Sequence, residues 1–199
     1  EEDIERYAGK YDNGYRPIRE ARYERMKELG IIPKHWALSP QAGNWTDNAE
    51  SNRWEARLME TYAAMIYRMD QGVGEIVESL RRNERLENTL ILYLQDNGAC
   101  AEGIGRKERS NWEIPNPKPI AAEQLQTRWN PPMQTRDGRV VQGGPGVLAG
   151  ADDTYIAYGP NWANVSNTPF REYNHWVHEG GISTPLIAHW PKGIDPKLN

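Results

Sequence analysis

The sequence predicts an α/β fold in which a mainly parallel sheet is flanked by helices. Two neighbouring patterns carry this prediction: a long amphipathic helix from Arg53 to Arg82, and the segment from Asn88 to Leu94, whose residues Leu90, Ile91, Leu92, Tyr93 and Leu94 form a continuous apolar run. A run without alternation suits a strand that is covered on both faces, as in parallel sheets between helices. The order of helix, short link and strand makes half of an α/β unit. Further strands are expected at Tyr155 to Tyr158 and at Pro185 to Trp190.

The helices follow from capping and periodicity. Pro17 to Leu29 predicts a helix, because proline suits a first turn and Gly30 stands at the expected C-cap. The helix from Arg53 to Arg82 carries an apolar stripe that must lie against another apolar surface. The stripe consists of Leu58, Tyr62, Met65, Ile66, Met69, Val73, Ile76, Val77 and Leu80. Gly72 and Gly74 indicate a bend or the close approach of another backbone.

A long loop excursion is expected over residues 103–153, which are rich in proline and glycine and show no sustained period. Loops of this length are uncommon inside compact domains and often form binding surfaces. A short helix is expected near Ala121 to Thr127. Trp112 and Trp129 make the excursion the expected place for substrate specificity, because aromatic rings suit sugar or aryl faces.

Composition excludes several classes of function. The 199 residues include 24 Lys and Arg against 28 Asp and Glu, with a formal charge of -4 and no basic block, so a nucleic-acid partner is not expected. No stretch has the apolar length of a membrane span, and the acidic first residues do not resemble a signal peptide. Cys100 is the single cysteine, which excludes an internal disulfide and a zinc-finger type of cluster.

The stretch Asp96-Asn97-Gly98 follows the predicted strand and admits two interpretations. Asn-Gly is a favoured tight turn in any protein. A hairpin needs a partner strand directly afterwards, however, and the residues from Ala99 to Gly103 are a poor partner. The alternative is that Asp96 and Asn97 supply oxygen ligands to calcium or magnesium at the carboxyl end of a strand. Two ligands do not form a site alone, so the local pattern favours the turn.

A second candidate region runs from Asn167 to Pro191. Its structural interpretation is a helical turn over Pro169 to Tyr173, a turn at Gly180-Gly181 and a strand. In the functional interpretation, His175 and His178 are polar site residues three positions apart. The residues alone leave both interpretations open.

Four segments taken in order resemble the arylsulfatase family. They are "YDNGYRPIREARYERMKELGIIP" (11–33), "YAAMIYRMDQGVGEIVESL" (62–80), "NTLILYLQDNGACAEG" (88–103) and "YGPNWANVSNTPFREYNHWVHEGGISTPLIAHWPKGI" (158–194). The resemblance implies part of an alkaline-phosphatase-like sandwich whose sheet is incomplete at the N-terminal side. It implies that residues 1–199 are the C-terminal portion of a sulfatase catalytic domain, with the excursion at 103–153.

The resemblance also implies a mechanism and a set of site residues. In this family a calcium ion is held by an early acid pair and by a later Asp-Asn pair, which falls on Asp96 and Asn97. The nucleophile is a formylglycine made from a C-x-P-x-R type of motif, and this sequence contains no such motif around Cys100. The formylglycine and half of the calcium ligands are therefore expected outside this chain, and the chain alone is expected to be inactive.

One position departs from the family pattern. A lysine that contacts the sulfate usually follows the "PFR-x-Y" stretch, but Asn174 stands there. An asparagine donates hydrogen bonds without supplying positive charge. Neighbouring His175 or His178 are the candidate replacements if they are protonated.

The function implied is calcium-assisted hydrolysis of sulfate esters, with a sulfated small molecule or a sulfated glycan as substrate. The alternatives are a phosphodiester or phosphonate hydrolase of the same superfamily and a non-catalytic, sulfatase-like binding protein. By resemblance the location is periplasmic, secreted or lysosome-like. An incomplete sheet would expose an apolar face, so self-association is also expected.

Overall fold

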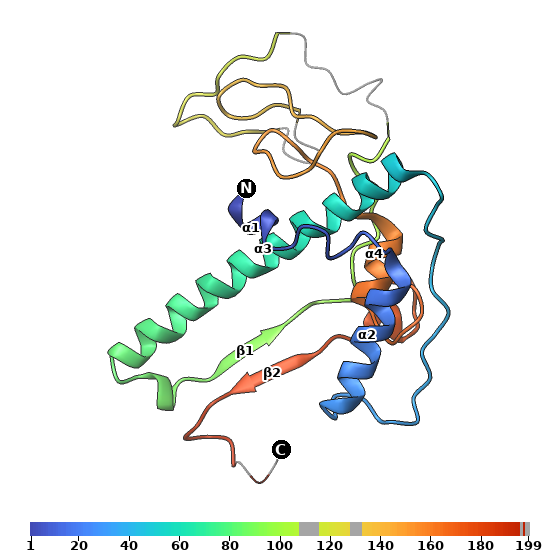
Figure 1. Ribbon diagram of the computed structural model, residues 1–199. Helices are drawn as coiled ribbons and strands as arrows, with labels where there is room; N and C mark the ends of the chain where they lie inside the picture. Colours follow the sequence, from blue (N-terminus) through green and yellow to red (C-terminus); the bar gives the residue numbers. More distant parts are fainter. Residues whose placement is uncertain (108–115, 128–132, 196, 198–199) are drawn as a thin grey trace.

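The computed structural model describes residues 1–107, 116–127, 133–195 and 197. The helices are α1 (Glu2–Glu5), α2 (Tyr15–Glu28), α3 (Ala49–Arg82), the 3-10 turn η1 (Leu86–Asn88), α4 (Gly159–Ser166) and α5 (Glu179–Ile182), and the strands are β1 (Ile91–Leu94) and β2 (Leu186–His189). Helix α3 forms a long rod beside the two strands, and α2 and α4 pack against each other at the end where β1 finishes (Figure 1). No helix in these ranges combines the length and apolarity needed to cross a bilayer.

Helix α3 begins at a side-chain cap. The Oδ1 atom of Asn48 accepts a hydrogen bond from the backbone N–H of Ser51 at 2.9 Å, which satisfies one of the free donors of the first turn. Arg81 and Arg82 lie in the last turn, where their positive charge interacts favourably with the negative end of the helix dipole. The helix starts at Ala49 instead of the expected Arg53, because the cap adds a polar first turn that has no apolar periodicity.

The core is aromatic and joins α2, α3 and α4. Trp162 is fully buried, and its ring meets the ring of Tyr15 edge-on with centroids 4.6 Å apart. Its indole Nε1 donates to the carbonyl oxygen of Glu55 at 2.9 Å, so the polar atom of this buried side chain is satisfied. Met59 and Val165 complete this cluster. Helix α4 was not expected from the sequence, because its glycine, proline and asparagines are poor helix formers.

The apolar stripe of α3 is only partly covered within the described residues. Leu58 is buried, whereas Met65 and Ile76 are each 64% exposed. The expectation that the whole stripe packs on an apolar surface is therefore wrong within the described residues. A Cβ placed on Gly72 or Gly74 would meet no atom within 4 Å, so the close approach expected there is wrong as well.

The two strands pair antiparallel, with Ile91 opposite His189 and Leu94 opposite Leu186. The expectation of a mainly parallel sheet is wrong for this pair, because the chain leaves β1 at its carboxyl end and returns to that same end to begin β2. The return is fixed where the hydroxyl of Thr184 donates to the carbonyl oxygen of Gln95 at 2.8 Å. Leu92 and Leu186 remain more than half exposed on one face of the sheet.

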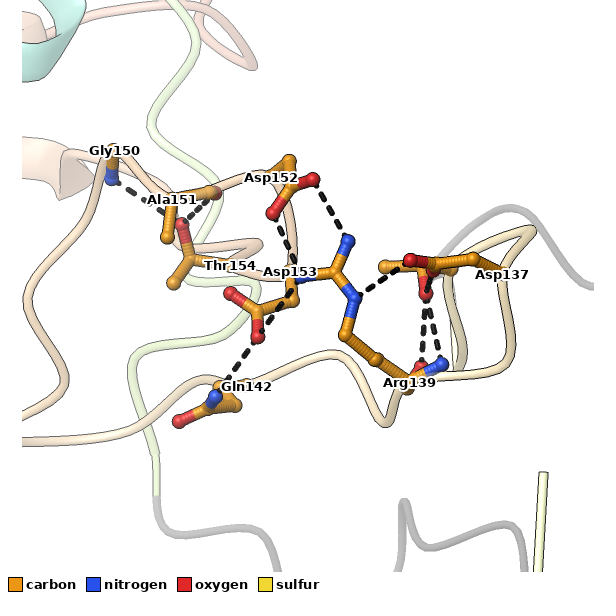
Figure 2. Close-up of polar contacts among 9 residues, drawn as sticks. Asp137, Arg139, Gln142, Gly150, Ala151, Asp152, Asp153 and Thr154 are labelled. Atoms are coloured by element: carbon orange, nitrogen blue, oxygen red, sulfur yellow. Dashed lines mark hydrogen bonds and ion pairs between the residues drawn. The ribbon is translucent and has the colours of Figure 1, made fainter. Parts of the chain in front are cut away.

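The excursion folds back on itself through an ion-pair network (Figure 2). The Nη atoms of Arg139 bind the two carboxylate oxygens of Asp152 at 2.7 and 2.8 Å, and its Nε lies 2.9 Å from Asp137. The expected helix at Ala121 to Thr127 is replaced by turns and bends, and the expected strand at Tyr155 to Tyr158 is irregular. Trp112 and Trp129, where specificity was expected, lie outside the described residues.

Candidate functional site

The stretch Asp96-Asn97-Gly98 continues away from β1 and does not turn back as a hairpin, because the partner strand β2 begins only at Leu186. The backbone N–H of Gly98 donates to the carbonyl oxygen of Gly181 at 2.9 Å. A Cβ on Gly98 would lie 2.0 Å from the carbonyl oxygen of Gly180, so this position tolerates only glycine. The glycine therefore serves close backbone packing, and the side chains of Asp96 and Asn97 are left exposed beside it.

The segment from Asn167 to Gly181 lies against the residues that follow Gly98. The Oδ1 atom of Asn167 accepts a hydrogen bond from the backbone N–H of Ala99 at 2.8 Å. Its Nδ2 donates to the carbonyl oxygens of Glu172, at 2.9 Å, and of Gly180. Asn167 thus bridges both segments, and sequence reasoning did not identify it.

Asn174 belongs to the same contact. Its backbone N–H donates to the carbonyl oxygen of Ala99 at 3.0 Å, and its Oδ1 accepts from the backbone N–H of Ala101 at 3.2 Å. The side-chain oxygen is therefore engaged within the protein. The Nδ2 group is the part of this amide that remains to donate to a ligand.

Each of the two predicted histidines has a carboxylate partner. The Nε2 atom of His175 lies 3.1 Å from Oε1 of Glu102, and both side chains are exposed. The Nε2 atom of His178 lies 3.0 Å from Oε2 of Glu172, and its ring stacks on Trp176. The two glutamates orient the imidazoles and were missed as site residues. The one indication in the sequence was that both glutamates lie in the two segments that also carry the predicted site residues.

Gly180 and Gly181 form part of the short helix α5 and not an isolated turn. A Cβ on Gly180 would lie 1.8 Å from the carbonyl oxygen of Arg171, and one on Gly181 would lie 1.9 Å from that of Trp176. The segment folds so tightly on itself that side chains are excluded at both positions. The helical turn expected over Pro169 to Tyr173 is replaced by bends.

Arg19 supports this region from α2. It is 1% exposed, and its Nη2 donates to Ser39 Oγ at 2.6 Å and to the carbonyl oxygen of Phe170 at 3.0 Å. Burial lowers the pKa of the guanidinium, which has neutral acceptors as its hydrogen-bond partners. Arg19 therefore fixes the start of the segment that carries Asn174 and the histidines.

The Asp96 and Asn97 side chains suit a hard cation in chemistry but supply only part of its coordination. A carboxylate and an amide oxygen at adjacent positions match the oxygen ligands that calcium prefers. Among the described residues, no group of three or more His, Cys, Asp or Glu side chains gathers closely enough to hold a metal ion. The two side chains are therefore suited to be part of the ligand set of a calcium ion, and such a site needs further ligands.

Comparison with known proteins gives the family. The Sulfatase family profile matches residues 2–199. The chain belongs to the sulfatase family. It is 31% identical over 202 residues to an uncharacterized sulfatase of Schizosaccharomyces pombe, covering 99% of this chain and 32% of that protein. It is also 31% identical over 205 residues to the arylsulfatase of Klebsiella aerogenes, covering 96% of this chain and 37% of the relative.

A third sulfatase shares a shorter stretch. The uncharacterized sulfatase YdeN of Escherichia coli is 46% identical over 44 residues, which is 22% of this chain and 8% of that protein. The chain spans about a third of the length of the two sulfatases that it matches from end to end. Its α/β architecture is compatible with an alkaline-phosphatase-like fold.

Proposed function

We propose that the protein hydrolyses sulfate esters, with these residues forming one side of the active site. The observation that supports this most directly is the contact of Ala99 and Ala101 with Asn174. Hydrogen bonds join the stretch that follows Asp96-Asn97 to the segment that carries the two histidines, in a chain from the sulfatase family, and this supports the proposal. The expected substrate is a sulfated small molecule or a sulfated glycan.

Each residue then has a chemical role. Asp96 and Asn97 would hold a calcium ion, which supplies positive charge to neutralise the sulfate oxygens. The Nδ2 group of Asn174 donates a hydrogen bond to a sulfate oxygen, and its orientation is fixed by Ala101. His175 or His178 holds the proton that the departing alcohol takes. A formylglycine supplied from outside these 199 residues is the proposed nucleophile.

A second candidate function is sulfate-ester binding without turnover. The neutral Asn174 favours it, because its side-chain oxygen is engaged by Ala101 and the position supplies no charge. In a water-excluded site, a donor that carries charge stabilises an anionic transition state more strongly than a neutral amide. The two candidates therefore differ in what a lysine at this position would do.

The test replaces the aligned third of the Klebsiella arylsulfatase by residues 1–199 and measures hydrolysis of a chromogenic aryl sulfate. We expect the chimera to be active and calcium-dependent, and Asp96→Ala to lower kcat/KM about 100-fold or more. Asp70→Ala, at an exposed acid on α3, is the matched control and should leave the rate unchanged. The 199-residue chain alone should show no turnover.

Asn174→Lys in the same chimera separates the two candidates. A rise in kcat from an already active chimera shows a working site with a weakened sulfate contact. A chimera that binds calcium and an aryl sulfate, yet stays inactive until lysine is introduced, supports the binding protein. Activity of the isolated chain would contradict the proposed division of the active site.

A further inference from the structure

A polar cavity of about 660 Å³ is lined by the beginning of α2 and by a loop that packs beside it. Residues 13–20 contribute one part of the lining, and residues 38–45 contribute the other. The five candidate site residues are all described by the structure, and none of them lines this cavity. The proposed hydrolysis therefore gives the cavity no role, although its volume suits a small ligand.

Helix α2 begins at this cavity without a cap of its own. Its N-cap residue is Gly14, which has no side chain, and its first turn contains no acidic residue. Within the part of the chain that the structure describes, the backbone N–H groups of Tyr15 and Arg16 have no acceptor, and both residues line the cavity. Free N–H groups at the positive end of a helix dipole attract an anion.

Arg19 adds a buried positive charge to the same lining. Its side chain is 1% exposed, and its Nη atoms donate to one hydroxyl and three carbonyl oxygens, none of which is charged. Its Nε is buried and has no partner among the described residues. Arg16 and Glu20, the other charged lining residues, pair with each other at 2.7 Å. The charge of Arg19 is thus left without a counter-ion, and a buried charge of this kind favours the binding of an anion.

Gln41 supplies a hydrogen-bond acceptor to the lining. Its Nε2 donates to the carbonyl oxygen of Ala42 at 2.7 Å, which identifies the other end of the amide as the oxygen. This Oε1 atom is buried and has no donor in the described part of the chain. Sulfate has no proton to donate to such an acceptor at neutral pH, whereas hydrogen phosphate keeps a P–OH group. The lining therefore suits an oxyanion that also donates one hydrogen bond.

The loop side of the cavity is held in a defined position. The backbone N–H of Ala42 donates to Oδ1 of the fully buried Asn164 at 3.0 Å. The ring of Trp45 meets the ring of Tyr15 edge-on, with centroids 5.0 Å apart. Walls that are fixed before a ligand arrives lower the entropic cost of binding.

We propose that this cavity binds inorganic phosphate in its hydrogen phosphate form. The phosphate oxygens accept hydrogen bonds from the N–H groups of Tyr15 and Arg16, and the P–OH group donates to Gln41. Arg19 supplies the compensating charge. The side chain of Arg16 is 80% exposed, so it is free to turn from Glu20 toward the ligand. This inference does not depend on the proposed hydrolysis of sulfate esters.

The test measures binding to the 199-residue chain by calorimetry at pH 8 and constant ionic strength. We expect inorganic phosphate to bind with a dissociation constant of about 1 mM or tighter. Sulfate and the monoester glycerol 3-phosphate carry no acidic proton at this pH, so both should leave Gln41 unpaired and bind about tenfold more weakly. Comparison with the monoester separates free phosphate from a phosphate group on a larger molecule.

Two variants of lining residues should weaken phosphate binding about tenfold or more. Arg16→Gln removes a charged donor at an exposed position. Asn13→Asp keeps the side-chain shape and places a negative charge beside the N-terminal end of α2. Arg25→Gln is the matched control, because Arg25 is exposed in the last turn of the same helix, pairs with Glu28 at 3.1 Å and does not line the cavity. It should bind phosphate like the wild type, and circular dichroism checks that all variants fold.

Asn174→Ala separates this cavity from the candidate site and should also bind phosphate like the wild type. If Asn174→Ala loses the binding instead, phosphate occupies the candidate site and the proposal is wrong. Absent phosphate binding, equal effects of Arg16→Gln and Arg25→Gln, or binding of sulfate or glycerol 3-phosphate as tight as that of inorganic phosphate would each overturn it as well.

Discussion

The Oδ1 atom of Asn167 accepts a hydrogen bond from the backbone N–H of Ala99 at 2.8 Å, which joins positions 68 residues apart in the chain. The amide nitrogen of the same side chain donates to the carbonyl oxygens of Glu172 and Gly180. Asn167 thus contributes three hydrogen bonds to a contact in which Gly98 and Asn174 also take part, between the strand end that carries Asp96 and the loop that carries Asn174.

Asn167→Ala should lower the free energy of unfolding by about 2–3 kcal/mol, because it removes three hydrogen bonds and leaves backbone groups unpaired. Chemical denaturation measures the change. Asn83→Ala is the control, because Asn83 is exposed and its side chain donates only to Ser79 within the end of α3. If both variants lose the same small amount, Asn167 does not hold the two segments together.

Gly98→Ala should destabilise the protein by about 3 kcal/mol, because the added Cβ would stand 2.0 Å from the carbonyl oxygen of Gly180. Gly72→Ala should instead stabilise it by about 0.5–1 kcal/mol, since Gly72 lies in the open middle of α3. Thermal unfolding of both variants checks the opposite signs. A wild-type melting temperature for Gly98→Ala would show that the loop moves to accept a side chain.

Arg19→Ala should lower the free energy of unfolding by about 3 kcal/mol, because it leaves the hydroxyl and carbonyl oxygens of Ser39 without their donor and removes the stronger of two hydrogen bonds to the carbonyl of Phe170. Arg16→Ala, on the exposed side of the same helix, removes a solvated ion pair with Glu20 and should leave the free energy of unfolding nearly unchanged. Urea unfolding compares the two. If both variants lost the same free energy of unfolding, the loss would reflect the change of helix propensity at α2 and not the hydrogen bonds of Arg19.

Tyr15 should make the protein sensitive to alkali. Burial raises the pKa of its phenol from 10.0 to about 12, so the unfolded chain releases this proton first as the pH rises. The contribution of Tyr15 to the free energy of unfolding is complete below about pH 10 and declines toward pH 12, by about 3 kcal/mol in all. In the Tyr15→Phe variant, this part of the decline in the free energy of unfolding at alkaline pH should disappear.

The measurement for Tyr15 is the free energy of unfolding at several pH values between 8 and 12. Tyr155→Phe, at an exposed tyrosine, is the control and should retain the wild-type slope. A Tyr15→Phe variant with that same slope would show that the phenol ionises equally well in the folded protein.

The sheet should mediate self-association. Leu92 and Leu186 expose apolar surface on one face, and a two-stranded sheet leaves backbone groups unpaired at its edges. The double variant Leu92→Lys, Leu186→Lys should shift sedimentation profiles toward monomer. Leu125→Lys, at an exposed residue of the excursion, should not. A wild-type chain that is already monodisperse and monomeric would refute this prediction.

Several elements follow from local patterns alone. The helix expected at Pro17 to Leu29 corresponds to α2, the long stripe to α3, and the run before Asp96 to β1. Periodicity and caps are local properties, so they survive in the folded chain. Helix α4 has weak local signals and forms because Trp162 is buried against Tyr15 and Glu55, which are distant in the sequence.

Residue patterns also led to the sulfatase family and to the five candidate site residues, Asp96, Asn97, Asn174, His175 and His178. They did not reveal the partners of these residues. Glu102, Glu172 and Asn167 gain their roles from contacts between segments about 70 residues apart, or from a backbone turn that brings them together. No periodic pattern encodes such contacts.

The sequence by itself determined α2, α3, the first strand and the family, because each depends on spacing within one segment or on motifs in order. Only the tertiary structure decided that β1 and β2 run antiparallel and that Gly98 is required by packing and not by a turn. The physical reason is that strand direction and backbone contact depend on where the chain returns after the excursion. That return is set by long-range hydrogen bonds, such as the one from Thr184 to Gln95.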